Sequence, residues 1–239
     1  MAKKKVMLFI VEGPTDETSL STVLNRIFNS STVKFQVVHG DALTRDFTAS
    51  DKIVAAVWEQ VKAFMGDIYK KSDICRIVHL TDMDGVYIPD AAVVHDESME
   101  PKAPPFYTDT QIQTPNVEGI LDRNKRKRDN INRLSACPKI SGIPYSMYYF
   151  SLNLDHVLHG KTNLSDWEKV QCAEEFDLKY GDDPDGFILL FMKESSFSVC
   201  DDYRSSWAFI KTGLHSLERY SNFGIELPPA NAARPAAEE

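Results

Sequence analysis

The sequence contains few cysteines, and they are scattered along the chain. No two of them form a CxxC pair, so the sequence indicates neither a zinc knuckle nor a disulfide framework. Reduced thiols are the usual state of cysteine in the cytoplasm. The four positions are Cys75, Cys137, Cys172 and Cys200. Their spacing favours a cytoplasmic protein that is not held together by cross-links.

A long apolar segment is also missing. A helix that spans a bilayer needs about 20 consecutive apolar residues, and no stretch of this chain approaches that length. Lys3, Lys4 and Lys5 precede a short apolar run, as in a signal peptide, but Glu12 ends the run early and no small-residue cleavage site follows. The sequence therefore predicts a protein of the cytoplasm without a membrane partner.

The sequence contains fewer basic residues than acidic residues. Lysine and arginine number 27 against 35 aspartates and glutamates, which gives a net charge of −8. This balance argues against a protein that coats nucleic acid through general basicity. It does not exclude an enzyme that binds phosphates through a metal ion and a local basic patch. The sequence also has no P-loop, no glycine-rich dinucleotide pattern and no Ser-His-Asp order.

The sequence does contain two apolar runs that each end in acidic residues. Residues 6–11 are followed by EGPTDE, and the mostly apolar residues 74–80 are followed by TDMDG. Both runs have the length of a buried strand, and turn-forming or acidic residues end them abruptly. If both are parallel strands of one sheet, their carboxyl ends lie at the same edge, where ligands of open α/β sheets bind. Glu12, Asp82 and Asp84 would then lie together.

Such a cluster of carboxylates predicts a bound cation. Like charges repel at close range, so acidic groups gathered in one place usually share a metal ion. Asp82 and Asp84 flank a single residue, and in an extended segment their side chains point the same way. A divalent metal site is therefore the leading hypothesis. The competing interpretation is that these acids are solvated loop residues and helix caps, which is the commoner role for Asp16 taken alone.

The first 85 residues alternate between strand and helix patterns. Strands are predicted at 6–11, 33–39 and 74–80, and helices are predicted after residue 15 and from residue 50. The apolar residues expected on the buried helix faces are Leu20, Val23, Leu24, Ile27 and Phe28, and then Ile53, Val54, Val57, Trp58, Val61 and Phe64. This order predicts an α/β fold with a mostly parallel sheet that has helices on its faces.

The alternating pattern breaks down after the second acidic motif. Residues 86–143 are punctuated by prolines and are typical of a long insertion, with one helix at about 117–134. Residues 145–152 have the pattern of a further strand that rejoins the sheet. Mainly helical segments are predicted at 154–159, 165–176, 187–192 and 203–220.

The predicted domain organisation follows from these segments. Residues 1–160 are expected to form the α/β core, interrupted by the insertion. Residues 161–227 are expected to form a helical part packed on the core. Residues 228–239, rich in alanine and proline, are predicted to be a disordered tail.

The pairing of Val-Glu-Gly-x-Thr-Asp-Glu with a later Asp-x-Asp-Gly resembles the Toprim domain. That domain occurs in topoisomerases, bacterial primases and the overcoming-lysogenization-defect class of nucleases, where a glutamate ends the first strand and an Asp-x-Asp pair ends a neighbouring one. The residues that match are Glu12, Gly13, Asp82 and Asp84, and Asp16 falls where the nuclease branch tends to keep a second acid. The resemblance covers about residues 5–85.

The resemblance implies a Toprim-like Rossmannoid sheet and a nuclease that cleaves or transfers phosphodiester bonds of DNA or RNA with Mg²⁺ or Mn²⁺. Glu12 would be a metal ligand or general acid/base, and Asp82 and Asp84 would be metal ligands. Asp16 would bind at a second site. Metal-bound carboxylates suit this chemistry because the ion activates water and neutralises charge on the phosphate. Similar stand-alone domains occur in bacterial and phage proteins of defence and repair, so the analogy implies phage defence or DNA repair.

A basic run in the predicted helix at 117–134 suggests a nucleic-acid contact. Lys125, Arg126, Lys127 and Arg128 could hold a nucleic-acid backbone beside the acidic site. A charge run on a helix is more often a solvated face, and this interpretation is slightly favoured.

A phosphatase is the main alternative to the nuclease. Residues 80–86 also resemble the opening motif of haloacid-dehalogenase-like phosphatases, in which Asp82 would be the nucleophile and Asp84 the acid/base. The acids of residues 181–185, with Lys161, could imitate that family's late motif. Against this, the opening motif normally ends the first strand of the fold, whereas here a complete βαβα unit precedes it.

Two non-catalytic functions also fit the sequence. The chain could be a metal-binding module that senses nucleotide. It could instead be a structural partner of a larger complex, such as an ATPase, with the helical part as its docking surface.

Overall fold

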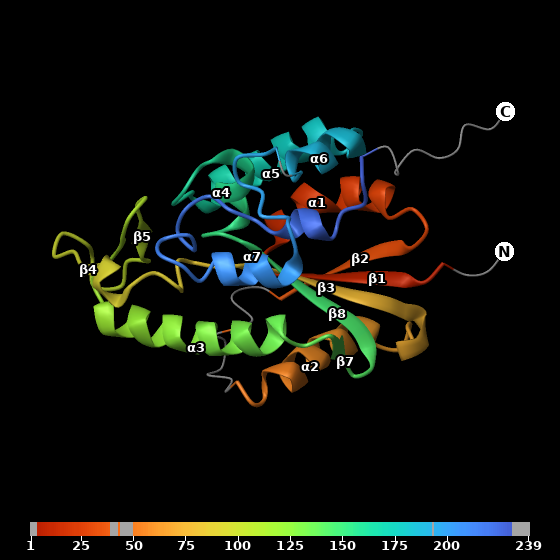
Figure 1. Cartoon of the computed structure of the whole chain (residues 1–239), viewed down its shortest axis with the longest axis horizontal. Coiled ribbons are helices and arrows are strands. Elements are labelled where there is room, and N and C mark those ends of the chain that lie inside the picture. Colours follow the sequence, from red (N-terminus) through yellow and green to blue (C-terminus); the bar gives the residue numbers. More distant parts are fainter. Residues whose placement is uncertain (1–3, 39–42, 44–49, 193, 231–239) are drawn as a thin grey trace.

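The computed structural model describes residues 4–38, 43, 50–192 and 194–230, and these form an α/β fold with helices on both faces of a central sheet (Figure 1). The strands are β1 (Val6–Val11), β2 (Thr32–Val37), β3 (Ile74–Asp82), β4 (Val93–His95), β5 (Phe106–Tyr107), β6 (Ile112–Thr114), β7 (Lys139–Ile140) and β8 (Ile143–Phe150). The helices are α1 (Pro14–Ile27), α2 (Ile53–Met65), α3 (Val117–Ser135), α4 (Leu154–His159), α5 (Asp166–Tyr180), α6 (Pro184–Leu190) and α7 (Tyr203–Phe209).

The central sheet has five strands in the order β2-β1-β3-β8-β7. β1 pairs in parallel with β2 and β3, β3 pairs in parallel with β8, and only the short β7 is antiparallel. The prediction of an α/β fold with a mostly parallel sheet is confirmed. Because Ile10 pairs with His79, Glu12 lies level with Thr81 two residues further along both strands.

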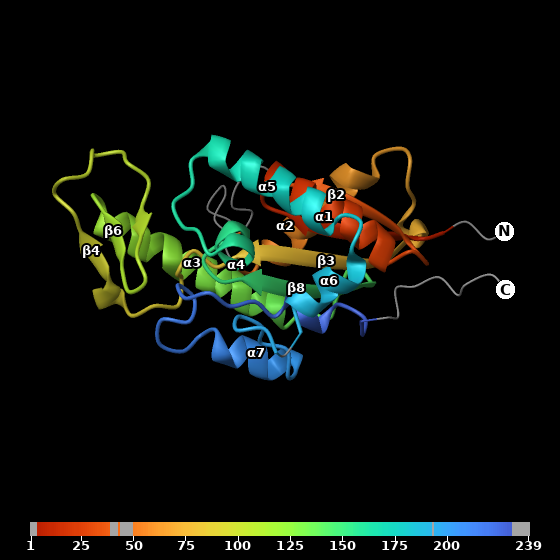
Figure 2. The ribbon, with the colours of Figure 1, turned by 90° about the horizontal axis from the view of Figure 1, so that it is seen from above.

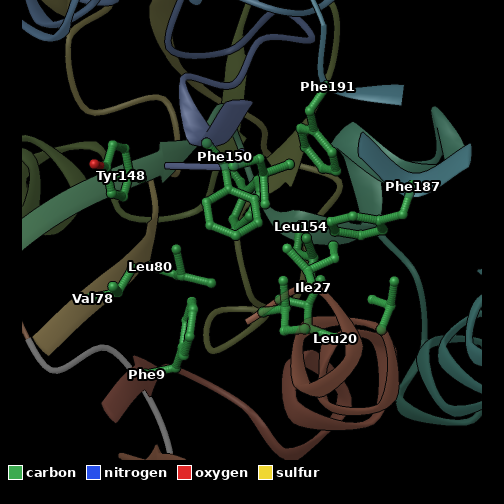
Figure 3. Packing of buried hydrophobic residues seen from close by; sticks show 14 of the residues in the cluster. Phe9, Leu20, Ile27, Val78, Leu80, Tyr148, Phe150, Leu154, Phe187 and Phe191 are labelled. Carbon is green, nitrogen blue, oxygen red and sulfur yellow. The ribbon is translucent and has the colours of Figure 1, made fainter. Parts of the chain in front are cut away.

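Alternate residues of the central strands face two separate cores. In β1, Met7, Phe9 and Val11 pack with α1, α5 and α6, whereas Val6, Leu8 and Ile10 pack with α2, α3 and α7. Figure 3 shows the first of these cores, where Phe9 and Val78 from the sheet face Leu20 of α1. A strand that is covered on both faces needs a continuous apolar run. This requirement explains why the run that ends at Glu12 shows no alternation.

Within residues 86–143, the predicted insertion, a separate small sheet is followed by α3, and β7 then joins the central sheet. The strand order of the small sheet is β4-β6-β5, and its core contains Ile88, Val93 and Ile112. Figures 1 and 2 show it at one end of the molecule, beside the first turns of α3. Of this region the sequence predicted only the helix, because strands of two or three residues are too short to establish a period.

The predicted helix over 203–220 is wrong beyond Phe209, where α7 ends. The chain then turns at Gly213, whose φ of +57° favours glycine. The His215 ring folds back and stacks on Phe209, with 3.9 Å between the ring centroids. This turn brings Ser216 against the loop that follows β3, where its backbone oxygen accepts a hydrogen bond from the N–H of Gly85. The segment therefore packs at the edge of the sheet and does not continue the helix.

Two other predictions extend past the described residues. The strand expected at 33–39 ends at Val37 in the structure, and residues 39–42 lie outside the described part. Residues 231–239 of the tail that was predicted to be disordered also lie outside it. Within the described part, no helix combines the length and the apolar composition needed to cross a bilayer.

Candidate active site

The ends of β1 and β3 bring the first three predicted acids together. Glu12 directly follows β1, and its Oε1 accepts hydrogen bonds from Thr81 Oγ1 at 2.9 Å and from the backbone N–H of Asp82 at 3.1 Å. The Lys127 ammonium lies 2.6 Å from Asp84 Oδ2 and 3.8 Å from Glu12 Oε1. The adjacency predicted from the two strand-ending motifs is therefore present.

Asp84 lies in a sharp turn just past β3. Its φ is +46° and that of Gly85 is +67°, so two successive residues adopt the left-handed conformation. A Cβ on Gly85 would lie 3.0 Å from Ile112 Cδ1 and 3.3 Å from Leu217 Cδ1, so the turn needs glycine for space as well as for backbone freedom. This turn leads the chain from the sheet edge into the insertion.

Asp16 is both a helix cap and a member of the acidic cluster. Its Oδ2 accepts a hydrogen bond of 2.9 Å from the backbone N–H of Gly13, at the start of α1. It also lines the same cleft as Glu12 and Asp82. Burial, with the charge of Asp155 as a smaller contribution, raises the pKa of Asp16 to about 6.

Asp82 is the last residue of β3, and its carboxylate contacts the start of α4. Its Oδ1 accepts a 3.1 Å hydrogen bond from the backbone N–H of Leu154, the first residue of α4. Burial raises the pKa of Asp82 well above its usual range, and the charges of Glu12, Asp16 and Asp84 raise it further. Among the described residues, Asp82 has no ion pair.

Lys127 belongs to the basic run, but its side chain points into the protein. It is completely buried (0% exposed), whereas Lys125 is exposed and Arg126 and Arg128 are partly exposed. Lys127 lies four residues before Ile131 and therefore shares the buried face of α3. The helical spacing of Lys127 and Ile131 predicts this shared face from the sequence. The run is thus split, with one lysine inside the acidic cluster and three residues toward the surface.

Arg123, one helical turn before Lys127, ties the insertion to the acidic cluster. Its Nη2 donates to the backbone oxygen of Asp84 at 3.0 Å, and its Nη1 donates to the Tyr107 hydroxyl of β5 at 3.1 Å. Arg123 and Lys127 together fix Asp84 through both its backbone and its side chain. Nothing in the local sequence marks Arg123 for this role.

Two further residues of the cleft were not identified from the sequence. Asp155 of α4 and Lys169 of α5 line a cleft of about 430 Å³ together with Glu12, Asp16 and Asp82. Burial raises the pKa of Asp155. Both residues come from the helices after β8, so only the folded arrangement places them near β1 and β3.

The acids of residues 181–185 lie elsewhere. Asp182 forms an ion pair with Arg26, in the last turn of α1, whereas Asp16 is in its first turn. Asp183 caps α6 by accepting a hydrogen bond from the backbone N–H of Gly186. The structure therefore does not bring the late motif of the phosphatase interpretation to Asp82.

The donor chemistry of the cleft fits a hard divalent cation, although the side chains do not form a complete ligand set. Within the described residues, no group of three or more His, Cys, Asp and Glu side chains could hold an ion as it stands. Mg²⁺ needs fewer protein ligands, because it keeps several waters and binds through one or two carboxylates. Asp16 and Asp82 line one cleft. Burial, and to a smaller extent the neighbouring acids, raise their pKa values, and a cation there would favour their charged forms.

Comparisons with models of known families, with curated proteins and with solved structures gave no match to this chain.

Proposed function

We propose that this chain is a Toprim-like enzyme that cleaves phosphodiester bonds of nucleic acid with Mg²⁺ or Mn²⁺. One observation carries the proposal. The Glu12 carboxylate accepts a hydrogen bond from the backbone N–H of Asp82 at the end of the adjacent parallel strand, and both residues line one cleft. This is the edge of an open α/β sheet at which ligands bind.

The residues of the cleft have distinct roles in this proposal. Asp82 and Asp16 would hold the metal ion, which would neutralise charge on the phosphate and make water a better nucleophile. Glu12 is the general acid/base, and its two hydrogen bonds to Thr81 and Asp82 fix the orientation of its carboxylate. Lys169, on the wall of the cleft, supplies a positive charge for a phosphate oxygen.

Asp84 has a different role from the one its motif implies. Its carboxylate is engaged by the buried Lys127 ammonium at 2.6 Å. In the proposed mechanism this pair fixes the side chain of Asp84, so Asp84 shapes the edge of the cleft. Its part in binding a metal ion remains a prediction from the resemblance.

A cleavage assay with matched variants tests the proposal. Purified protein is incubated with labelled single-stranded and duplex DNA and RNA, with Mg²⁺, Mn²⁺ or EDTA. Glu12→Gln and Asp82→Asn should each reduce the cleavage rate by at least roughly 100-fold, as expected when a group acting in the transition state is lost. Glu17→Gln is the control, because Glu17 is in the first turn of α1 but does not line the cleft.

Four outcomes would contradict this function. Metal-independent cleavage, or cleavage that Glu12→Gln leaves unchanged, would exclude the assigned chemistry. Hydrolysis of small phosphomonoesters that survives Glu12→Gln but is lost in Asp82→Asn would favour the phosphatase. Metal binding without turnover on any substrate would favour a non-catalytic partner of another protein.

A further inference from the structure

A second cleft opens beside the acidic cluster and reaches into the insertion. Its volume is about 460 Å³, and it shares Asp82 and Lys169 with the first cleft. A cleft of this size accommodates one small molecule or one nucleotide unit. A double helix is far too large to enter it.

The two ends of this insertion cleft differ in chemistry. One end is formed by Asp82 and Asp84, the acids at the sheet edge. The other end is apolar and is formed by Pro104, Phe106 and Leu164. Phe106 is 47% exposed. With a divalent cation bound at the acids, a ligand that fits both ends carries phosphate on one side and a flat apolar group on the other.

The wall that carries Phe106 is fixed in place relative to the acids. The Asn163 side chain pairs with the backbone of Tyr107, accepting from its N–H at 2.8 Å and donating to its carbonyl oxygen at 2.7 Å. The Tyr107 hydroxyl accepts from Arg123, which also donates to the backbone oxygen of Asp84. The apolar end and the acidic end therefore belong to one connected hydrogen-bond network.

We propose that the insertion cleft binds the base of an unpaired nucleotide whose phosphate lies at the acidic cluster. This inference rests on the proposed function and names its substrate as single-stranded nucleic acid. Bases stack on exposed aromatic side chains in proteins that bind single strands, and Phe106 provides such a surface. The net charge of −8 agrees with this mode, since a pocket for one nucleotide requires less positive charge than a surface that tracks a duplex.

Binding to a short labelled single-stranded oligonucleotide, measured by fluorescence anisotropy with Mg²⁺ present, tests the inference. The measurement uses the full chain with Glu12→Gln, so that cleavage does not consume the probe. Adding Phe106→Ala should weaken binding by roughly 5- to 150-fold, the range expected for loss of one stacked base. Phe106→Trp should restore it, because the stacking surface is kept. Leu178→Ala is the control, since Leu178 is 86% exposed on α5 and does not line either cleft.

The outcomes separate this inference from the proposed function. Equal affinity for a hairpin-closed duplex and a single strand, no effect of Phe106→Ala, or no binding of either probe would overturn the inference, whatever the cleavage assay shows. Phe106-dependent binding of the single strand would support the subsite even if no metal ion supported cleavage. In that case only the nuclease proposal would fail.

Discussion

Asp82 and Asp84 are separated by one residue, yet they lie in opposite electrostatic surroundings. Asp84 faces the buried ammonium of Lys127 at 2.6 Å, and Arg123 holds its backbone oxygen. Asp82 faces Glu12, Asp16 and Asp84, and burial together with these charges raises its pKa well above the usual range. The protein therefore supplies a permanent cation in direct contact with Asp84. Asp82 has no such ion pair among the described residues, so its charge is available to a cation from solution.

The largest expected effect comes from removing the permanent cation. Lys127→Met should lower the free energy of unfolding by about 3 to 5 kcal/mol, because it leaves the Asp84 carboxylate without its buried partner. Urea denaturation of the metal-free protein measures this loss. Lys125→Met on the exposed side of the same helix is the control and should change stability by less than about 0.5 kcal/mol. Equal stability of Lys127→Met and wild type would refute the comparison.

A smaller loss is expected when the partner of that cation is neutralised. Asp84→Asn should lower the free energy of unfolding by about 1.5 to 3 kcal/mol, the range for a hydrogen bond to a charged group. The same urea experiment on Asp82→Asn should show no loss, because Asp82 has no ion pair among the described residues. If Asp82→Asn proved as destabilising as Asp84→Asn, the two acids would not differ as described.

The pH dependence of Asp82→Asn should sharpen the comparison further. The folded-state pKa values of Asp16, about 6, and of Asp82 are raised, so the folded state binds protons more tightly than the unfolded state. Their stabilising contribution is present below pH 4 and is lost as the pH rises through the folded-state values. In EDTA at pH 7, Asp82→Asn should therefore be more stable than wild type, because the variant has no carboxylate to ionise at this position. Urea melts between pH 4 and pH 8 measure this, and a wild type that gains stability over that range would contradict it.

Metal ions should stabilise the folded protein by binding to the carboxylates of Asp16 and Asp82. A ligand at 100 times its Kd stabilises the folded state by about 2.7 kcal/mol, so millimolar Mn²⁺ should raise the Tm of wild type. The rise should shrink in Asp82→Asn. An unchanged wild-type Tm, or an equal rise in the variant, would mean that these carboxylates do not form a metal site.

The smallest effect is expected on the outer side of α3. If Lys125 contacts a phosphate of bound nucleic acid, Lys125→Ala should reduce the dependence of log affinity on log salt concentration by about 1, with no change in stability. Anisotropy titrations at several salt concentrations measure this slope. An unchanged slope would assign Lys125 to the solvated face that the sequence also allowed.

The fold and the acidic cluster were partly predictable because they follow from local patterns. Apolar runs ending at Glu12 and Asp82 indicate buried parallel strands, and parallel strands must end at the same edge. The burial of Lys127 was also predictable, because it lies four residues before Ile131 on the same helix face. The sequence interpretation instead grouped it with the basic run. Asp155 and Lys169 were not predictable, since only the packing of α4 and α5 places them at the site. The role of Arg123 was not predictable either, because nothing in its local sequence indicates a bond to the backbone of Asp84.

The left-handed pair Asp84 and Gly85 has a consequence for how this protein can diversify. The turn takes the chain out of the sheet immediately after the acidic motif, and β8 brings it back beside β3. Residues 88–116, which carry the small sheet, form an excursion that adds no residue to either core of the central sheet. Loops of this kind tolerate insertion and deletion far better than the strands they connect. Descendants of this chain could therefore exchange the excursion, and with it their choice of ligand, while inheriting the carboxylates unchanged.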